Sequence, residues 1–171
     1  MRITGGTHKG RKIRCISAKH LRPTLSKVRE AVFSVLGQNL ENRTFCDAFA
    51  GSGIMGFEAY SRGSSIVGFS ETNIRALSLI NSTIDIFNDA DRFVQSRSAR
   101  ALIASRQWDI VFLDPPYSTS PQPLIEANSN QAKTWVVETA RNTQITVPTG
   151  FFSSFERAYG NTKITILTVC S

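Results

Sequence analysis

Asp114, Pro115, Pro116 and Tyr117 follow directly after a short apolar run, and together they could bind a planar amine. Residues 109–113 are rich in β-branched and aromatic side chains, which is typical of a strand buried on both faces. Proline cannot donate to a β-ladder, so the strand is predicted to end here. Ligands bind at strand ends in open α/β sheets. A carboxylate, carbonyl groups on rigid prolines and an aromatic ring therefore predict a site for a planar, amine-bearing substrate.

Residues 51–56 form a second candidate site, because Gly-Ser-Gly-Ile-Met-Gly matches the dinucleotide-binding pattern G-x-G-x-x-G. Glu71 follows Gly51 by 20 residues. Glycines let the backbone approach a ligand closely, and an acidic residue after the next strand can accept hydrogen bonds from a ribose diol. NAD and S-adenosylmethionine both carry that diol, so these residues alone leave both cofactors open.

Predicted strands and helices alternate along the part of the chain that carries these residues. The strands are expected at 45–48, 65–70, 93–97, 109–113 and 135–138, and the helices at 28–36, 54–62, 74–87, 99–104 and 124–128. This alternation indicates an α/β fold with a parallel sheet. Gly160-Asn161 is a two-residue hairpin signal, so residues 155–159 and 163–169 should add an antiparallel pair. At the start of the chain, residues 2–4 and 11–15 should form a short β-hairpin.

The composition fits one globular domain spanning residues 1–171. Of the 171 residues, 41% are hydrophobic and 19% are charged, which is ordinary for a soluble protein. No apolar stretch approaches the ~20 residues of a membrane span. Basic residues continue where a signal peptide would be apolar, so a cytoplasmic protein is expected. The three cysteines are odd in number and far apart, which argues against a disulfide framework and a paired metal-ligand motif.

Positive charge is concentrated near the N-terminus. Residues 1–44 hold ten Lys and Arg against two acidic residues, a net charge of +8, whereas the remainder holds ten against eleven, a net charge of −1. This distribution predicts a basic extension, residues 1–43, that binds a polyanion and is attached to a nearly neutral core, residues 44–171. A merely solvated basic face is the alternative.

Two motifs combined resemble a known enzyme class. Asp-Pro-Pro-Tyr at 114–117 together with residues 47–53 resembles the amino-methyltransferases, which methylate exocyclic amines of bases with S-adenosyl-L-methionine. Residues 2–6, 9–12, 22–24, 28–31 and 159–162 are similar to the bacterial 16S ribosomal RNA guanine-N2 methyltransferases. The resemblance covers residues 2 to about 168. It implies a Rossmann-like, seven-stranded methyltransferase sheet, S-adenosyl-L-methionine as cofactor, and 16S ribosomal RNA or a small-subunit assembly particle as partner. A monomer is expected.

The resemblance also implies roles for individual residues. The residues expected to hold the cofactor are Asp47, Ala50, Gly51, Ser52, Gly53, Glu71, Ser98 and Ala99. Asp114 to Tyr117 would be catalytic: the N2 amine would donate to Asp114 and the Pro115 carbonyl, localising its lone pair toward the methyl group, while Tyr117 stacks on the base. Those expected to contact RNA are Lys9, Arg11, Lys12, Arg22, Thr24 and Arg29. No metal and no covalent intermediate are required.

Two features depart from the family pattern, and other functions stay open. The segment between Tyr117 and Trp135 is short and polar, where family members commonly have a longer amphipathic helix. Many relatives have Asp-Ala after the third strand, where this chain has Ser98-Ala99. Adenine-N6 methylation of DNA or RNA would use the same tetrad. An NAD-dependent dehydrogenase is disfavoured because 171 residues leave no room for a substrate domain. A ribosome-binding factor without activity is the third alternative, and the intact residues 114–117 argue against it.

Overall fold

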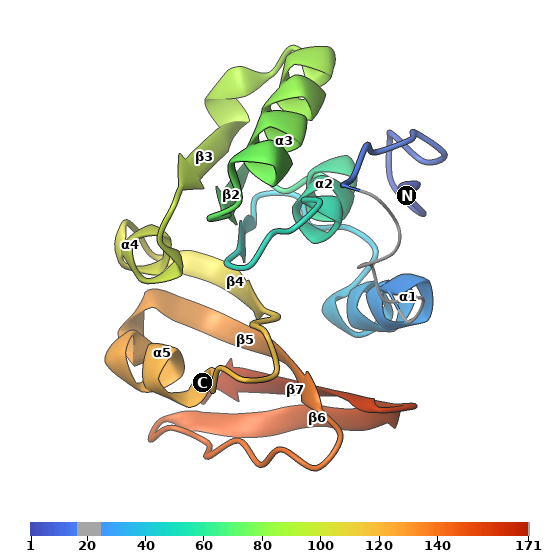
Figure 1. Cartoon of the computed structure of the whole chain (residues 1–171). Helices are drawn as coiled ribbons and strands as arrows, with labels where there is room; N and C mark the ends of the chain where they lie inside the picture. The colour runs from blue at the N-terminus through green and yellow to red at the C-terminus, as the bar shows by residue number, and fades with distance from the viewer. Residues whose placement is uncertain (17–24, 171) are drawn as a thin grey trace.

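The computed structural model describes residues 1–16 and 25–170. The strands are β1 (Thr44–Asp47), β2 (Ile66–Ser70), β3 (Phe93–Ser96), β4 (Trp108–Leu113), β5 (Ala132–Ala140), β6 (Phe151–Tyr159) and β7 (Thr162–Val169). The α-helices are α1 (Leu25–Leu36), α2 (Ile54–Ser61), α3 (Ile74–Phe87), α4 (Ala99–Ala104) and α5 (Gln122–Ala127). Short 3₁₀ helices are η2 (Ala90–Arg92) and η3 (Ser129–Gln131). Within the described residues, one seven-stranded sheet has the order β3-β2-β1-β4-β5-β7-β6 (Figure 1).

The sheet is parallel except at its C-terminal part. β1 pairs with β2 and β4, β2 with β3, and β4 with β5, all in parallel. β7 runs antiparallel to both of its neighbours, β5 and β6. This arrangement confirms the predicted α/β class and the C-terminal antiparallel pair. β5 extends beyond the predicted 135–138 because Ala132 pairs with β4 and Ala140 pairs with β7. These partners are distant in the chain, so local sequence does not mark the extension.

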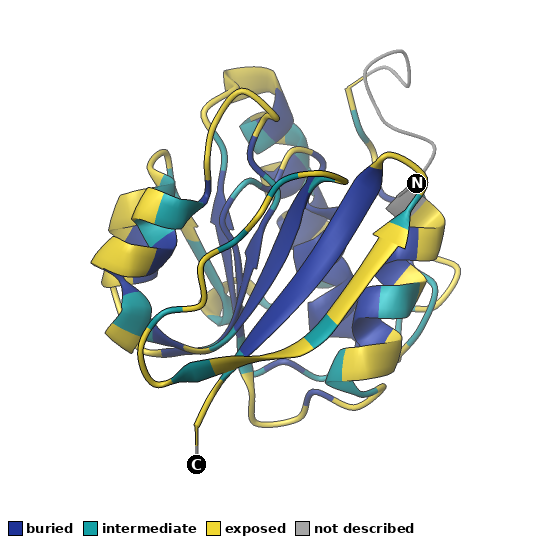
Figure 2. Cartoon of the chain, turned by 90° about the horizontal axis from the view of Figure 1, so that it is seen from below, coloured by how far each residue is buried: buried dark blue, intermediate teal, exposed yellow. Residues whose placement is uncertain are grey.

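Helices cover both faces of the sheet, with α1, α2 and α3 on one face and α4 and α5 on the other (Figure 1). In β4, Ile110 and Phe112 belong to the first hydrophobic core, whereas Val111 and Leu113 belong to the second. Burial on both faces explains the continuous apolar run of this strand. The central strands are buried, and the edge strand β6 is largely exposed (Figure 2). No helix in the part of the chain that the structure describes is long and apolar enough to cross a membrane.

The first 14 residues, here called the N-terminal ribbon, fold back on themselves without forming two strands. Its two arms meet at an isolated bridge between Arg2 and Lys12, where Ile3 N donates to Arg11 O at 3.0 Å and Ile13 N donates to Met1 O at 2.9 Å. The predicted pairing of the arms is therefore present, but the prediction of two full strands is wrong. Ile3 and Ile13 are buried on its inner side. Beyond Ile3, whose carbonyl accepts from Gly10 N at 2.9 Å, the amides of Thr4 and Gly5 donate to the carboxylate of Glu58.

Glu58 of α2 joins the N-terminal ribbon, α1 and the end of α2. Its side chain is fully buried. The carboxylate accepts hydrogen bonds from Thr4 N at 2.9 Å and Gly5 N at 2.8 Å. It also lies 2.8 Å from Nη2 of Arg62 and 3.2 Å from Nε of Arg29. Two buried arginines and two backbone amides thus share one carboxylate, and the N-terminal ribbon is held firmly on α2.

Candidate active site

The predicted site residues gather at the carboxyl edge of the parallel strands. After β1 the chain builds β2 and β3 on one side of it, and β4 then pairs with the other side of β1. Such a switch point is where open α/β sheets bind ligands. Asp47 ends β1, and Asp114 directly follows β4. Glu71 and Ser98 follow the ends of β2 and β3 at the same edge.

The turn after β1 has the conformation that its glycines predict. Gly51 and Gly53 have φ angles of 53° and 74°, in the left-handed region that favours glycine. Gly53 N donates to Ala50 O at 2.7 Å, and Ala50 N donates to Ser70 O of β2 at 2.9 Å. A Cβ atom on Gly51 would meet no atom within 4 Å. The turn therefore offers open backbone to a ligand just before α2 begins.

Asp47 is buried beside this turn, with an exposed fraction of 1%. Its Oδ2 accepts a hydrogen bond from Gly56 N at 3.1 Å. Burial raises the pKa of Asp47 to about 7; the Gly56 hydrogen bond opposes this rise, and the negative charges of Asp114 and Glu71 add to it. Three neighbouring carboxylates make this edge suited to a cationic group.

Asp47→Asn is expected to stabilise the ligand-free protein at about pH 8. The pKa of Asp47 is raised from 3.8 to about 7, so the stability it contributes is present below about pH 4 and is lost as the pH rises through about 7. The loss is at most ~4 kcal/mol, at about 1.36 kcal/mol per pKa unit. Asparagine cannot ionise, so the variant should escape this loss. Urea unfolding at about pH 5 and about pH 8 measures the difference, and equal pH dependence in both proteins would contradict it.

Glu71 is oriented by the glycine turn itself. Its Oε2 accepts from Gly51 N at 2.8 Å, and its Oε1 accepts from Asn73 N at 2.7 Å. Each carboxylate oxygen can accept a further hydrogen bond, so hydroxyl donors could still bind here. Ser98 is the N-cap of α4, and its Oγ accepts from Ala101 N at 3.2 Å. A cofactor contact by Ser98 or Ala99 stays a prediction.

Asp114 to Tyr117 lead out of β4 over the sheet edge. Pro115 is buried, Asp114 is partly buried, and Tyr117 is 46% exposed. Thr119 N donates to Pro116 O at 2.7 Å, which closes a turn around Tyr117. The sequence motif thus forms a corner after β4, and its carboxylate, Asp114, lies close enough to Asp47 for its charge to raise the pKa of Asp47.

A cavity of about 230 Å³ lies beside this corner. It is lined by Pro115, Tyr117 and residues 118–121, and by Glu138, Thr139, Ala140 and Thr143 at and after the end of β5. A planar ring in this cavity would lie next to Pro115 and Tyr117. No motif marks the residues from β5, since they come close to Tyr117 only through the pairing of β4 with β5.

The predicted RNA contacts have different surroundings. Lys9, Arg11 and Lys12 are exposed on the N-terminal ribbon. Arg22 and Thr24 lie outside the described residues. Arg29 is only 2% exposed and is paired with Glu58, so the prediction that it contacts RNA is wrong. A pattern of basic residues on a helix cannot show that one of them faces a buried carboxylate from another helix.

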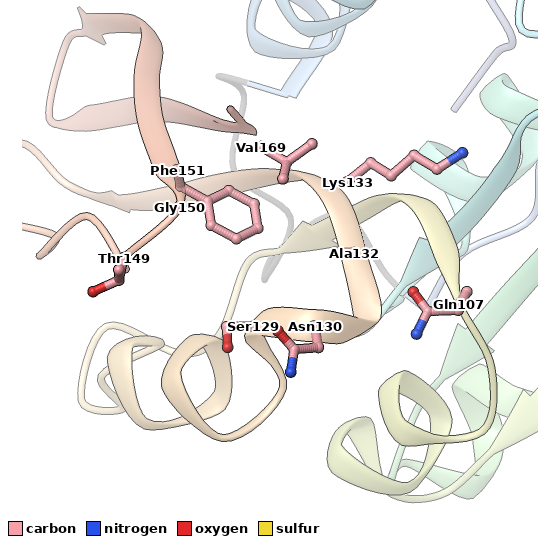
Figure 3. A pocket seen from close by; sticks show the side chains of 9 residues that line it. All are labelled: Gln107, Ser129, Asn130, Ala132, Lys133, Thr149, Gly150, Phe151 and Val169. Carbon is pink, nitrogen blue, oxygen red and sulfur yellow. The ribbon is translucent and has the colours of Figure 1, made fainter. Parts of the chain in front are cut away.

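Another cavity, of about 320 Å³, lies at the opposite edge of the sheet (Figure 3). Its lining residues are Gln107, Ser129, Asn130, Ala132, Lys133, Thr149, Gly150, Phe151 and Val169. None of the predicted site residues reaches it, and its Lys133 is paired with Asp109 at 2.8 Å. In residues 1–16 and 25–170, no group of three or more His, Cys, Asp and Glu could hold a metal ion.

The chain is similar to a family of proteins over nearly its whole length. The model of the family described as conserved hypothetical protein 95 matches residues 1–168. Ribosomal RNA small subunit methyltransferase D of Escherichia coli strain K12 is 32% identical, with 94% of this chain and 85% of the relative covered. The protein of the same name from Buchnera aphidicola of Acyrthosiphon pisum is 29% identical, with 99% and 93% covered.

Solved structures share the same fold. The Escherichia coli protein yhhF, described as a methyltransferase, superposes with a TM-score of 0.83 at 26% identity, covering 99% of this chain and 97% of that chain. M. capricolum TrmK, solved with S-adenosyl-homocysteine, has a TM-score of 0.65 at 10% identity, covering 87% and 69%. At that identity the second comparison bears on the fold alone.

Proposed function

Because the chain belongs to the conserved hypothetical protein 95 family, together with the ribosomal RNA small subunit methyltransferases D, we propose that it methylates the N2 amine of a guanosine in 16S ribosomal RNA. S-adenosyl-L-methionine is the methyl donor. The proposal rests on one observation: β1 and β4 are paired neighbours in the sheet. Asp114 and Pro115 therefore lie at the same edge as Asp47 and the glycine turn. An acceptor site for an amine and a site for a cationic donor thus share one edge of the sheet.

The donor would be held by residues whose chemistry fits it. Asp47 has a neighbouring turn of open backbone at Gly51 and a raised pKa that a nearby cation would lower. Glu71 has remaining acceptor capacity for a ribose diol. When bound, S-adenosyl-L-methionine supplies a methyl group on a positively charged sulfur. Asp47, Glu71 and the turn would hold that donor at the end of β1.

Asp114 and the Pro115 carbonyl would make the guanine N2 amine a better nucleophile. The lone pair of a guanine N2 is delocalised into the ring, which makes the amine a poor nucleophile. Hydrogen bonds from its N–H groups to Asp114 and Pro115 would localise the lone pair and stabilise the positive charge that develops on nitrogen. Tyr117 would stack on the base, a contact of roughly 1–3 kcal/mol that helps offset unstacking a flipped base. Holding the amine and the methyl group in line should supply much of the remaining rate.

The N-terminal ribbon is the proposed contact with RNA. Replacing Lys9, Arg11 and Lys12 together by Gln should weaken RNA binding and reduce the slope of log Kd against log salt concentration by up to about three counterions' worth. The reason is that each cation that pairs with a phosphate releases condensed counterions. The measurement is fluorescence anisotropy with a labelled 16S fragment at several salt concentrations.

Three exposed basic residues away from the N-terminal ribbon provide the control. Arg75, Arg106 and Lys133 are exposed, and replacing them by Gln removes the same total charge. For this control variant, the slope of log Kd against log salt concentration should stay near the wild-type value. If both triple variants lose the same slope, only the net charge of the chain matters, and the N-terminal ribbon has no special role.

Methyl transfer with nucleoside analysis tests the function. Purified protein is incubated with S-adenosyl-L-methionine carrying a labelled methyl group and 16S ribosomal RNA from cells that lack this gene. Mass spectrometry of the nucleosides should show N2-methylguanosine. N6-methyladenosine would favour the adenine-N6 alternative. RNA binding without any transfer would favour a non-catalytic ribosome-binding factor, and stabilisation by NAD but not by S-adenosyl-L-methionine would contradict the cofactor.

A further inference from the structure

Tyr117 is linked to a strand that contributes no residue to the sequence motif. Its hydroxyl lies 2.9 Å from Oγ1 of Thr162, within hydrogen-bond distance, and either atom can donate. Thr162 is the first residue of β7 and is only 2% exposed. An exposed aromatic ring is thus attached at its tip to a buried side chain 45 residues further along the chain.

Thr162 itself is fixed in position from two sides. It pairs with Ala140 at the end of β5 and with Tyr159 at the end of β6. The turn before it is held as well, because Arg141 N donates to Asn161 O at 2.8 Å. A hydroxyl group at the start of β7 therefore has a defined place relative to β5 and the cavity beside Tyr117.

The link matters because Tyr117 can rotate. The residue is 46% exposed and lines the cavity with Pro115. An exposed tyrosine side chain can change its rotamer on the picosecond-to-nanosecond scale, and a ring that rotates away offers no flat face to a base. A hydrogen bond at the ring's tip restricts that rotation before the base arrives, which lowers the ordering cost of stacking the flipped base within the bound complex.

We propose that Thr162 is a positioning residue, whose hydroxyl holds the Tyr117 ring in the orientation that receives the target base. This inference rests on the proposed function, because it assigns a role within the same site. Thr162 acts through Tyr117 and need not touch the base. The β6–β7 hairpin thereby becomes part of the substrate site. The residues proposed to bind the cofactor lie at the ends of β1 and β2, and the catalytic carboxylate lies at the end of β4.

Thr162→Val is the direct test, since it keeps the β-branched shape and removes the hydroxyl. A single hydrogen bond of this kind corresponds to a roughly threefold to tenfold effect. We expect kcat to fall by that factor, with RNA affinity unchanged because the N-terminal ribbon is intact. Thr162→Ser keeps the hydroxyl and should restore most of the rate. If Thr162 had a purely structural role, Thr162→Val would instead lower the melting temperature. The loss of kcat would then be the same with and without the Tyr117 hydroxyl.

Tyr117→Phe removes the same bond from the other side and completes a double-mutant cycle. If the two hydroxyls act as a pair, Thr162→Val should cost nothing more in the Tyr117→Phe background. Independent, additive losses would overturn the proposal. This variant also keeps the proposal testable should Thr162→Val fold poorly.

Thr165→Val is the matched control. Thr165 lies on the same strand, is equally buried at 2%, and its hydroxyl donates to Glu156 rather than to the motif. Its kcat should equal that of the wild type, and an equal loss in both threonine variants would overturn the proposal. Wild-type protein that transfers no methyl group contradicts the proposed function, whereas active wild type with an equally active Thr162→Val contradicts only the role of Thr162.

Discussion

Asp114→Ala is expected to lower the rate of methyl transfer by about 10²–10³-fold, the range found when one preorganised group at a developing charge is removed. The variant deletes both carboxylate oxygens that would accept from the target amine. RNA affinity should stay within about twofold of the wild type, since the N-terminal ribbon is unchanged. Single-turnover transfer with saturating RNA measures the chemical step directly.

The same variant should also change the titration of Asp47. The charge of Asp114 contributes to the raised pKa of Asp47, so its removal lowers that pKa and relieves repulsion at the sheet edge. Asp85→Ala, an exposed aspartate of α3, serves as the control and should retain full activity. If Asp114→Ala transfers methyl groups as fast as Asp85→Ala, the carboxylate after β4 takes no part in the chemistry.

Glu58→Gln is expected to destabilise the protein by about 3–5 kcal/mol, because breaking a buried ion pair leaves charge uncompensated. Two guanidinium groups are affected: the side chains of Arg29 and Arg62 are 3% and 5% exposed. The glutamine amide would also face the amides of Thr4 and Gly5, which are donors too. Such a loss is a large part of the free energy of unfolding of a typical protein, which is about 5–15 kcal/mol. Urea unfolding at neutral pH gives the free energy.

Glu30→Gln gives the comparison for Glu58, because Glu30 is an exposed residue of α1 with the same charge. Its free energy of unfolding should change by less than about 0.5 kcal/mol. Hydrogen exchange adds a local readout, as the amides of Thr4 and Gly5 should exchange faster in Glu58→Gln. A change of under about 1 kcal/mol in Glu58→Gln would mean that the buried cluster contributes little net stability.

The parts of the fold that could be predicted are those whose signals are local. The apolar run before Asp114 and the spacing of Gly51 and Gly53 depend on residues within one strand and one turn, and the structure has both as predicted. The helix from Ile74 to Phe87 was equally visible in its periodicity. Each of these patterns reports burial or backbone conformation at the residue itself.

The parts that could not be predicted depend on partners far away in the chain. Arg29 reads as one more cation of a basic segment, and only the packing of α1 against α2 brings it to Glu58. The amides of Thr4 and Gly5 donate to that carboxylate, 54 and 53 residues away, and the expected hairpin has an isolated bridge in place of two full strands. The contact of Tyr117 with Thr162 likewise needs the register of β5 with β7.

α2 sets a fixed separation between two parts of the proposed enzyme. The helix begins at Ile54, directly after the turn proposed to hold the donor, and its later residues Glu58 and Ser61 hold the N-terminal ribbon. All eight of its residues are buried. A helix of this length measures about 12 Å, and burial on every side prevents it from tilting or stretching. If the N-terminal ribbon binds RNA as proposed, α2 would therefore fix the distance between a bound phosphate and the methyl donor, and with it how far along the RNA the target nucleotide must lie.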